Sequence, residues 1–356
     1  MALSIGIVGL PNVGKSTLFN VLTQKKSAEA SNYPFCTIDP NVGIVKVPDE
    51  RLDKLANISN PTKIIPTTIE FVDIAGLVSG ASKGEGLGNK FLSHIRECDA
   101  ICEVVREFED GDIIHVNGKI DPDGDKETIN LELILADLAS VTKSLDKVAK
   151  EAKSGNKEAV ALRDLLSKIK ENLENEKAVR DIEMTEEEKL SIKSLSLLTA
   201  KPIIYVLNTK EVSQNIDGLK EKWGDDIVAL DAKMEEEIAE MDIEDQKEYI
   251  EELGLESSGL DKLIKASYKL LNLSTFFTTG KEETRAWTFK NGFKAPQAAG
   301  VIHTDFEKGF IRAEIIKYDD FVREGGESQC RDKGLIKTEG KEYIMQDGDI
   351  CHFLFN

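Results

Sequence analysis

Gly9-Leu10-Pro11-Asn12-Val13-Gly14-Lys15-Ser16-Thr17, near the start of the chain, has the spacing Gly-x4-Gly-Lys-Ser that is typical of a P-loop. It follows a short apolar run, residues 4–8, and leads into a helical pattern from Lys15 to about Leu22, so it connects a strand to a helix. The glycines allow backbone N–H groups to turn inward around phosphate oxygens, and the start of the helix adds positive charge. The pattern predicts a phosphate-binding loop in which Lys15 reaches the β- and γ-phosphates and Ser16 ligates Mg²⁺.

Two motifs further along the chain complete the expected phosphate and metal site. Asp73-Ile74-Ala75-Gly76 follows the apolar strand 69–73, where Asp73 is expected in the Mg²⁺ shell and the Gly76 amide on the γ-phosphate. Thr37 lies in the segment 32–40, between the glycine-rich loop of residues 9–17 and the motif at residues 73–76. We expect Thr37 to ligate Mg²⁺ only when a triphosphate is bound. Together they indicate a nucleoside triphosphatase that changes conformation with its nucleotide.

The base-recognition motif departs from the Asn-Lys-x-Asp of ordinary GTPases. Here a buried strand ends in Asn208-Thr209-Lys210-Glu211, so Glu211 replaces the Asp that accepts the guanine N–H groups. This loss of guanine discrimination favours ATP, with GTP as the alternative nucleotide, although Lys210 could still assist. The loop of Asp231, Ala232 and Lys233 is expected on the base side.

The catalytic position also differs from that of many relatives, because Leu77 stands where a water-orienting Gln is common. A leucine side chain cannot polarise water, so hydrolysis is slow or another residue positions the nucleophile. His115 lies in a loop-like stretch after the third strand and is the best candidate among four histidines. From the residues alone, a structural role for His115 is an equal alternative.

The arrangement of the chain predicts three parts. Apolar strands alternate with helices over residues 1–126 and 201–271, which indicates an α/β domain with a mostly parallel sheet covered by helices on both faces. Leu131, Leu138, Leu145 and Ala152 recur every seven residues, so residues 127–200 are expected to insert a helical coiled-coil hairpin, with packing on the body as the alternative. Residues 272–356 carry short strand-like runs and turns, and form a small α+β domain.

Composition excludes several classes of protein. The 356 residues carry a net charge of −19, which argues against a general polyanion binder such as a DNA-binding protein. Residues 138–170 form a local exception, with 8 basic and 4 acidic residues, and either a binding projection or a solvated helix face explains them. Five cysteines without a Cys-x-x-Cys pair indicate a reducing compartment. Neither a signal peptide nor a membrane span is found, so we expect a cytoplasmic protein.

These motifs, with Ala295-Pro296-Gln297-Ala298-Ala299-Gly300 and residues 302–313, resemble the YchF family, the Obg-like ATPases of the Obg branch of P-loop GTPases. The resemblance covers essentially the whole chain. It implies a G domain, a helical insert and a C-terminal TGS domain of β-grasp type.

For the site, the resemblance implies ATP hydrolysis with GTP also bound, and it implies that His115 is catalytic. Ser16 and Thr37 would bind Mg²⁺, and the loop residues contacting nucleotide would be Asn12, Val13, Gly14, Lys15, Ser16 and Thr17. Asn12 also resembles the loop residue of potassium-assisted relatives, which suggests K⁺ as a further cofactor. Association with ribosomes, through the insert and the TGS domain, is implied as well.

The leading hypothesis is therefore a slow ATPase, expected to be a monomer, whose nucleotide states switch a ribosome interaction. A first alternative is a GTP-specific ribosome-assembly switch. A second is a nucleotide-gated RNA- or protein-binding module whose hydrolysis is incidental, favoured by Leu77 and by the basic hairpin.

Overall fold

The computed structural model describes residues 3–24, 41–74, 87–109, 119–210 and 216–356. Its contacts divide the chain into two compact units, one of residues 1–44 and 70–263 and the other of residues 45–69 and 264–356. No described helix is long and apolar enough to cross a membrane. Among the described cysteines, Cys98, Cys102, Cys330 and Cys351 are free and buried.

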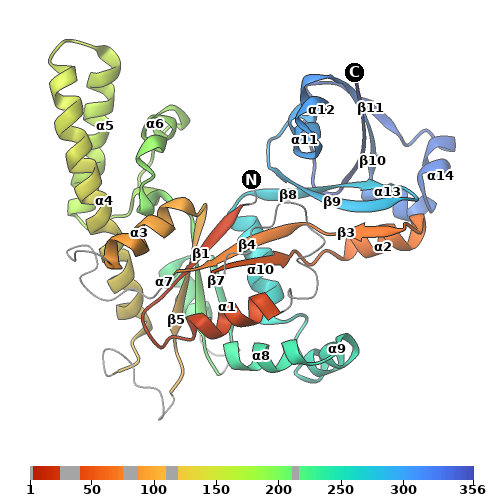
Figure 1. Cartoon of the computed structure of the whole chain (residues 1–356), viewed down its shortest axis with the longest axis horizontal. Coiled ribbons are helices and arrows are strands. Elements are labelled where there is room, and N and C mark those ends of the chain that lie inside the picture. Colours follow the sequence, from red (N-terminus) through yellow and green to blue (C-terminus); the bar gives the residue numbers. More distant parts are fainter. Residues whose placement is uncertain (1–2, 25–40, 75–86, 110–118, 211–215) are drawn as a thin grey trace. The chain divides into compact units, whose positions relative to one another are not determined.

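A six-stranded sheet organises the first unit, and Figure 1 labels its strands β1, β4, β5 and β7. The strand order is β2-β4-β1-β5-β6-β7. The strands are β1 (Ser4–Val8), β2 (Val42–Lys46), β4 (Thr68–Asp73), β5 (Ala100–Arg106), β6 (Ile203–Asn208) and β7 (Ile227–Leu230). β1 pairs parallel with both β4 and β5, and β5–β6 and β6–β7 are also parallel. Every residue of β5 and β6 is buried, as expected for strands covered on both faces. The predicted α/β fold with a mostly parallel sheet is confirmed.

The helices of this unit follow the strands. Among the described residues they are α1 (Lys15–Gln24), α3 (Leu87–Glu97), α4 (Pro122–Ala152), α5 (Lys157–Glu174), α6 (Glu186–Ile192), α7 (Ile216–Trp223), α8 (Ala232–Glu240) and α9 (Ile243–Glu252), with short 3₁₀ turns η2 (Val179–Asp181), η3 (Lys193–Leu195) and η4 (Leu198–Ala200). The next helix, α10 (Gly259–Leu270), begins in the first unit and ends in the second.

The predicted helical hairpin is confirmed as α4 and α5, which lie side by side (Figure 1). Asn156 caps α5 by accepting hydrogen bonds from Glu158 N at 2.9 Å and Ala159 N at 3.3 Å. Between the helices Val141, Leu166 and Ile169 are almost fully buried. The hairpin thus has an apolar core of its own.

One residue of the expected heptad pattern was assigned wrongly. Leu131 is 42% exposed, while Ile129 and Leu133 on the same helix are buried. The first part of α4 packs against the body through these neighbours, and the core shared with α5 begins only at Ile134. Because α4 packs first on the body and then on α5, a single apolar stripe with a seven-residue repeat does not continue along its whole length.

A buried carboxylate fixes α4 to the end of the insert. Asp137, which is fully buried, accepts hydrogen bonds from Leu198 N at 2.9 Å and from both the amide and the hydroxyl of Thr199 at 2.7 Å. Nearer the start of α4, the Lys126 ammonium lies 5.1 Å from the Tyr205 ring centroid and 5.2 Å from that of Trp223. These contacts hold the base of the hairpin on β6 and α7.

The second unit is built on another six-stranded sheet, of order β11-β10-β12-β8-β9-β3. Its strands are β3 (Lys63–Ile65), β8 (Leu273–Thr279), β9 (Glu283–Lys290), β10 (Phe310–Lys317), β11 (Lys337–Glu339) and β12 (Asp349–Phe355), and its helices are α2 (Glu50–Ser59), α11 (Ala295–Ile302), α12 (Thr304–Lys308), α13 (Tyr318–Glu324) and α14 (Glu327–Asp332). The hairpin β8–β9, the helix α11 and the central parallel strands β8 and β12 give the β-grasp arrangement that was predicted.

A contribution from the N-terminal half was not predicted for this body. β3 pairs parallel with β9, from Lys63↔Glu283 to Ile65↔Arg285. Leu52 and Leu55 of α2 are buried in a cluster with Phe277 and Phe321. The predicted boundaries, 126/127, 200/201 and 271/272, stay a prediction.

Candidate nucleotide site

Two glycines of the loop between β1 and α1 are required by close approach of neighbouring atoms. A Cβ on Gly9 would lie 2.8 Å from the carbonyl oxygen of Val104 in β5. Gly14 has φ +94°, a conformation that side chains disfavour, and a Cβ there would lie 2.2 Å from Nδ2 of Asn208. The loop therefore follows a path that only glycine permits at these two points.

Lys15 begins α1 and is almost buried, with 9% of the residue exposed. Its ammonium group forms an ion pair with the Asp73 carboxylate at the end of β4. The parallel register of β1 and β4, which aligns Ile7 with Asp73, brings the two motifs together although they lie 58 residues apart. Ser16, the next helix residue, is exposed.

Asn208 braces the loop from the end of β6. Its Nδ2 donates a hydrogen bond to the carbonyl oxygen of Val13 at 2.9 Å, and its Oδ1 accepts one from the amide of Ala232 at 3.1 Å. Only 4% of Asn208 is exposed. One side chain thus connects the phosphate loop to the start of α8, where Asp231 caps the helix through the amides of Lys233 and Met234.

A cavity of about 680 Å³ opens beside the loop, large enough for a nucleotide. It is lined by the loop and helix residues Leu10, Pro11, Asn12, Gly14, Lys15, Ser16 and Thr17, and by Phe108, Asn208, Lys210, Asp231, Ala232, Lys233 and Glu236. The cavity lies at the carboxyl ends of parallel strands, where open α/β sheets usually bind ligands.

Phe108, just past β5, was missed by the sequence analysis. Arg106 holds it in place, since its Nε donates to the Phe108 carbonyl at 2.9 Å and its guanidinium lies 4.4 Å from the ring centroid. The Lys210 ammonium lies 5.7 Å from the same centroid and donates to the carbonyl of Glu109 at 3.2 Å. The position of Phe108 directly after a buried parallel strand is the signal that could have found it.

The other sequence candidates fall into two groups. Thr209 is buried, donates its amide to the Leu230 carbonyl at 2.9 Å and is not among the residues that line the cavity. Thr37, Gly76, His115 and Glu211 lie outside the described residues.

The residues near Lys15 suit a magnesium ion that is coordinated partly by the protein and partly by phosphate oxygens. Ser16 and Asp73 offer a hydroxyl and a carboxylate, which are oxygen ligands of the kind Mg²⁺ prefers. Within the described ranges, no group of three or more His, Cys, Asp or Glu residues could hold a metal ion. A magnesium ion here would therefore depend on nucleotide phosphates and water for its remaining ligands.

Comparison with known proteins agrees with this geometry. The chain is 57% identical to the ribosome-binding ATPase YchF of Bacillus subtilis, over 100% of both proteins. The chain belongs to the YchF family. The YchF proteins of Escherichia coli O157:H7 and Mycoplasma genitalium, described in the same words, are 53% and 48% identical over 100% and 99% of each chain.

Two family models match the two ends of the chain, and one solved structure matches nearly all of it. Residues 4–136 match a family described as 50S ribosome-binding GTPase. Residues 273–356 match the C-terminal family of YchF GTPases, described as a protein of unknown function. The structure of the Schizosaccharomyces pombe YchF GTPase superposes with a TM-score of 0.88 at 41% identity, covering 99% of this chain and 97% of that one. The predicted family is thereby confirmed.

Proposed function

We propose that this protein is a slow, Mg²⁺-dependent ATPase whose nucleotide state switches an interaction with the ribosome. The observation that carries the proposal is the loop around Gly14, with Lys15 at its base and Asn208 bracing it beside a nucleotide-sized cavity. The relatives named above are called ribosome-binding ATPases and match the chain over its whole length, which supports the same reaction and partner here.

The phosphates of the nucleotide would be bound by residues 12–17. Lys15 would leave the Asp73 carboxylate for the β- and γ-phosphates, and this would free Asp73 to join Ser16 and Thr37 as oxygen ligands. A bound Mg²⁺ would neutralise charge on the transferred phosphoryl group. The Gly76 amide would donate to the γ-phosphate.

Water attack would be guided by His115, because Leu77 occupies the position at which many relatives have a Gln. Water would add to the γ-phosphorus while the bond to the bridging oxygen breaks, giving ADP and inorganic phosphate. Lys15 would stabilise the charge that develops at the phosphates. With a single residue orienting the water, turnover is expected to be slow.

Selectivity for the base would come from the Asn208 to Glu211 motif and from Ala232. Glu211 replaces the Asp that binds guanine in ordinary GTPases, and its side chain, longer by one methylene, would not hold its carboxylate at the same place. Phe108 offers an aromatic ring at the cavity wall for the purine. Thr209 would act through the backbone rather than through its buried side chain. Asn12 in the loop supports K⁺ as an additional cofactor.

The remaining assignments concern the whole protein. Residues 127–200 would be the insert and residues 272–356 a TGS domain, and both would contact the ribosome. We infer a cytoplasmic monomer with no DNA partner.

Nucleotide titration and hydrolysis assays test the proposal. Wild-type protein with Mg²⁺ and K⁺ should bind ATP at least as tightly as GTP and hydrolyse it, and Lys15→Ala should lose binding. His115→Ala should bind ATP but lose most of its turnover, whereas His94→Ala, which alters an exposed histidine of α3, should behave as wild type. ATP hydrolysis at the wild-type rate by His115→Ala would remove His115 from the mechanism.

A GTP-specific switch is the second candidate. It is favoured by Lys210, whose ammonium lies at the cavity wall beside Phe108, where a lysine can contact a guanine ring. A preference for GTP of a hundredfold or more, which corresponds to about 2.7 kcal/mol, would replace the ATPase proposal with this one.

A further inference from the structure

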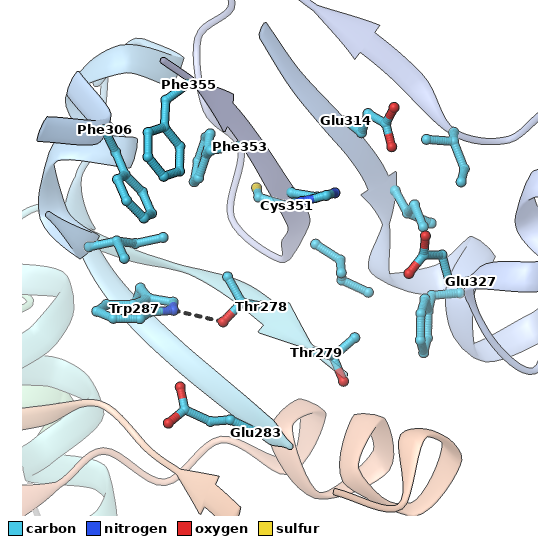
Figure 2. Close-up of a pocket in the computed structure, with 16 residues that line it drawn as sticks. Thr278, Thr279, Glu283, Trp287, Phe306, Glu314, Glu327, Cys351, Phe353 and Phe355 are labelled. Atoms are coloured by element: carbon cyan, nitrogen blue, oxygen red, sulfur yellow. Dashed lines mark hydrogen bonds between the residues drawn. The ribbon is translucent and has the colours of Figure 1, made fainter. Parts of the chain in front are cut away.

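A second cavity, of about 580 Å³, lies wholly within the β-grasp body (Figure 2). It opens where the two central strands separate. Among the described residues, β8 and β12 are in register only at Phe277↔Ile350. Beyond that pair, β8 continues to Thr279 and β12 continues to Phe355.

The strand segments that line the cavity have a partner on one side only. Residues 278–279 of β8 pair with β9, and residues 351–355 of β12 pair with β10. Strand edges of this kind accept an extended polypeptide as an additional strand. The five residues of β12 beyond the last shared pair extend over about 16 Å, which matches an added strand of about five residues.

Apolar side chains gather at one end of the cavity. Figure 2 shows Phe306, Phe353 and Phe355 together there. The rings of Phe306 and Phe355 stack with centroids 3.7 Å apart, and Phe355 remains 43% exposed. An aromatic surface that is partly open in this way favours an apolar side chain from a partner.

Carboxylates occupy the other walls. Glu314 and Glu327 lie at the opposite end of the view and Glu283 lies below β8, while none of the lining residues is Lys or Arg. Two neighbouring arginines form ion pairs with these carboxylates. The Arg331 Nη2 lies 2.8 Å from Oε1 of Glu327 and 3.4 Å from Oε2 of Glu314. The Arg285 Nη1 lies 4.0 Å from Oε1 of Glu283. Three carboxylates facing two arginines leave one negative charge in excess.

We propose that this cavity binds an extended basic peptide segment, which adds as a strand beside β12 and places alternate side chains on the phenylalanines and near the carboxylates. The inference rests on the proposed ribosome interaction and gives it a protein component. The excess carboxylate repels the phosphates of RNA and attracts Arg or Lys side chains.

Fluorescence anisotropy with the full-length protein tests the inference. The probe is a fluorescein-labelled heptapeptide, Arg-Val-Arg-Val-Arg-Val-Arg, at low ionic strength. Binding should weaken at least tenfold when Glu replaces Arg in the probe. It should weaken about as much when alternate peptide nitrogens are methylated on one edge, because methylation removes the donors that strand pairing requires.

A double variant and a matched control locate the binding. Glu283→Gln with Glu327→Gln should lower the affinity for the basic peptide about tenfold, and Phe355→Ser should also weaken it. Glu282→Gln, which alters the exposed neighbour of Glu283 outside the cavity lining, should leave the affinity unchanged. Unchanged melting temperature and Mg-ATP affinity of each variant would show that the fold is intact.

Equal peptide affinity of the double variant and the wild type, or no binding up to millimolar peptide, would overturn the inference. A uridine decamer that binds and displaces the peptide would make the occupant RNA instead. Either result leaves the proposed function standing if ribosome co-sedimentation continues to depend on nucleotide. If the wild-type protein did not bind Mg-ATP, the proposed function itself would be wrong.

Discussion

Asn208 makes the clearest link between one side chain and the nucleotide site. Its amide group satisfies the Val13 carbonyl and the Ala232 amide together, and no smaller side chain could reach both. Asn208→Ala should therefore destabilise the protein by about 2 kcal/mol, since two buried polar groups lose their partner. It should weaken ATP binding about tenfold, which is about 1.4 kcal/mol.

Chemical denaturation and ATP titration of Asn208→Ala check this expectation. Asn172→Ala is the control, because the partly exposed Asn172 side chain donates to the Lys168 carbonyl within α5, away from the nucleotide site. If ATP affinity were unchanged by Asn208→Ala, the brace would have no part in forming the loop.

Glu103 of β5 predicts a dependence of stability on pH. It is fully buried, and neither carboxylate oxygen has a hydrogen-bond partner within the described residues. Burial raises the pKa of this carboxyl well above its usual value, only partly offset by Arg180 and Lys126. The folded protein therefore keeps a proton that the unfolded chain has released above its ordinary pKa of about 4.5.

The stabilising contribution of this proton is fully present below the unfolded pKa and is lost as pH rises toward the higher folded pKa. Glu103→Gln removes this pH-dependent loss of stability, because the Gln side chain does not ionise. The melting temperature of the variant relative to wild type should rise as pH increases above about 4.5, and the rise should continue until the carboxyl of the folded protein also ionises. A difference that is constant with pH would show that Glu103 is ionised in the folded state.

At the scale of elements, the helical hairpin depends on one buried carboxylate as well as on its apolar core. Asp137→Ala would leave the buried amides of Leu198 and Thr199 without their acceptor. The expected loss of stability is about 2–4 kcal/mol, because buried neutral donors are left without a hydrogen-bond partner. Asp146→Ala, at an exposed position of α4, should change stability by less than about 0.5 kcal/mol.

Hydrogen exchange locates the effect of Asp137→Ala. Faster exchange should appear in α4 and η4, while the β-grasp body should be unaffected because Asp137 has no part in it. Uniformly faster exchange in both units would instead mean that Asp137 supports the whole chain rather than the hairpin.

At the scale of the whole molecule, local patterns predicted most of the first unit. The apolar runs that became β1, β5, β6 and β7 alternate with helices, and the glycine loop lies between β1 and α1 as its spacing requires. Contacts between segments far apart in the sequence were harder to predict. Residues 45–69 join the β-grasp body through β3–β9 pairing and α2 packing, which depends on a partner more than 200 residues away.

In the nucleotide site, too, the local motifs were predictable from the sequence and the contacts between distant residues were not. Lys15 and Asp73 lie in recognisable motifs, and their ion pair follows from parallel strands. The double role of Asn208 as a brace has no signature of its own, because the sequence does not show which atoms its amide would reach. Phe108 could have been inferred only by assigning function to the first residues after a buried strand.

Calorimetric titration of Mg-ATP into the full-length protein measures whether the loop from Gly9 to Thr17, completed by Lys15, binds the phosphates of a nucleotide. We expect saturable heat with the wild type and a loss of affinity of at least about a hundredfold, or 2.7 kcal/mol, with Lys15→Ala. No heat from well-folded wild type with either Mg-ATP or Mg-GTP, or equal affinity of the Lys15→Ala protein, would contradict the account.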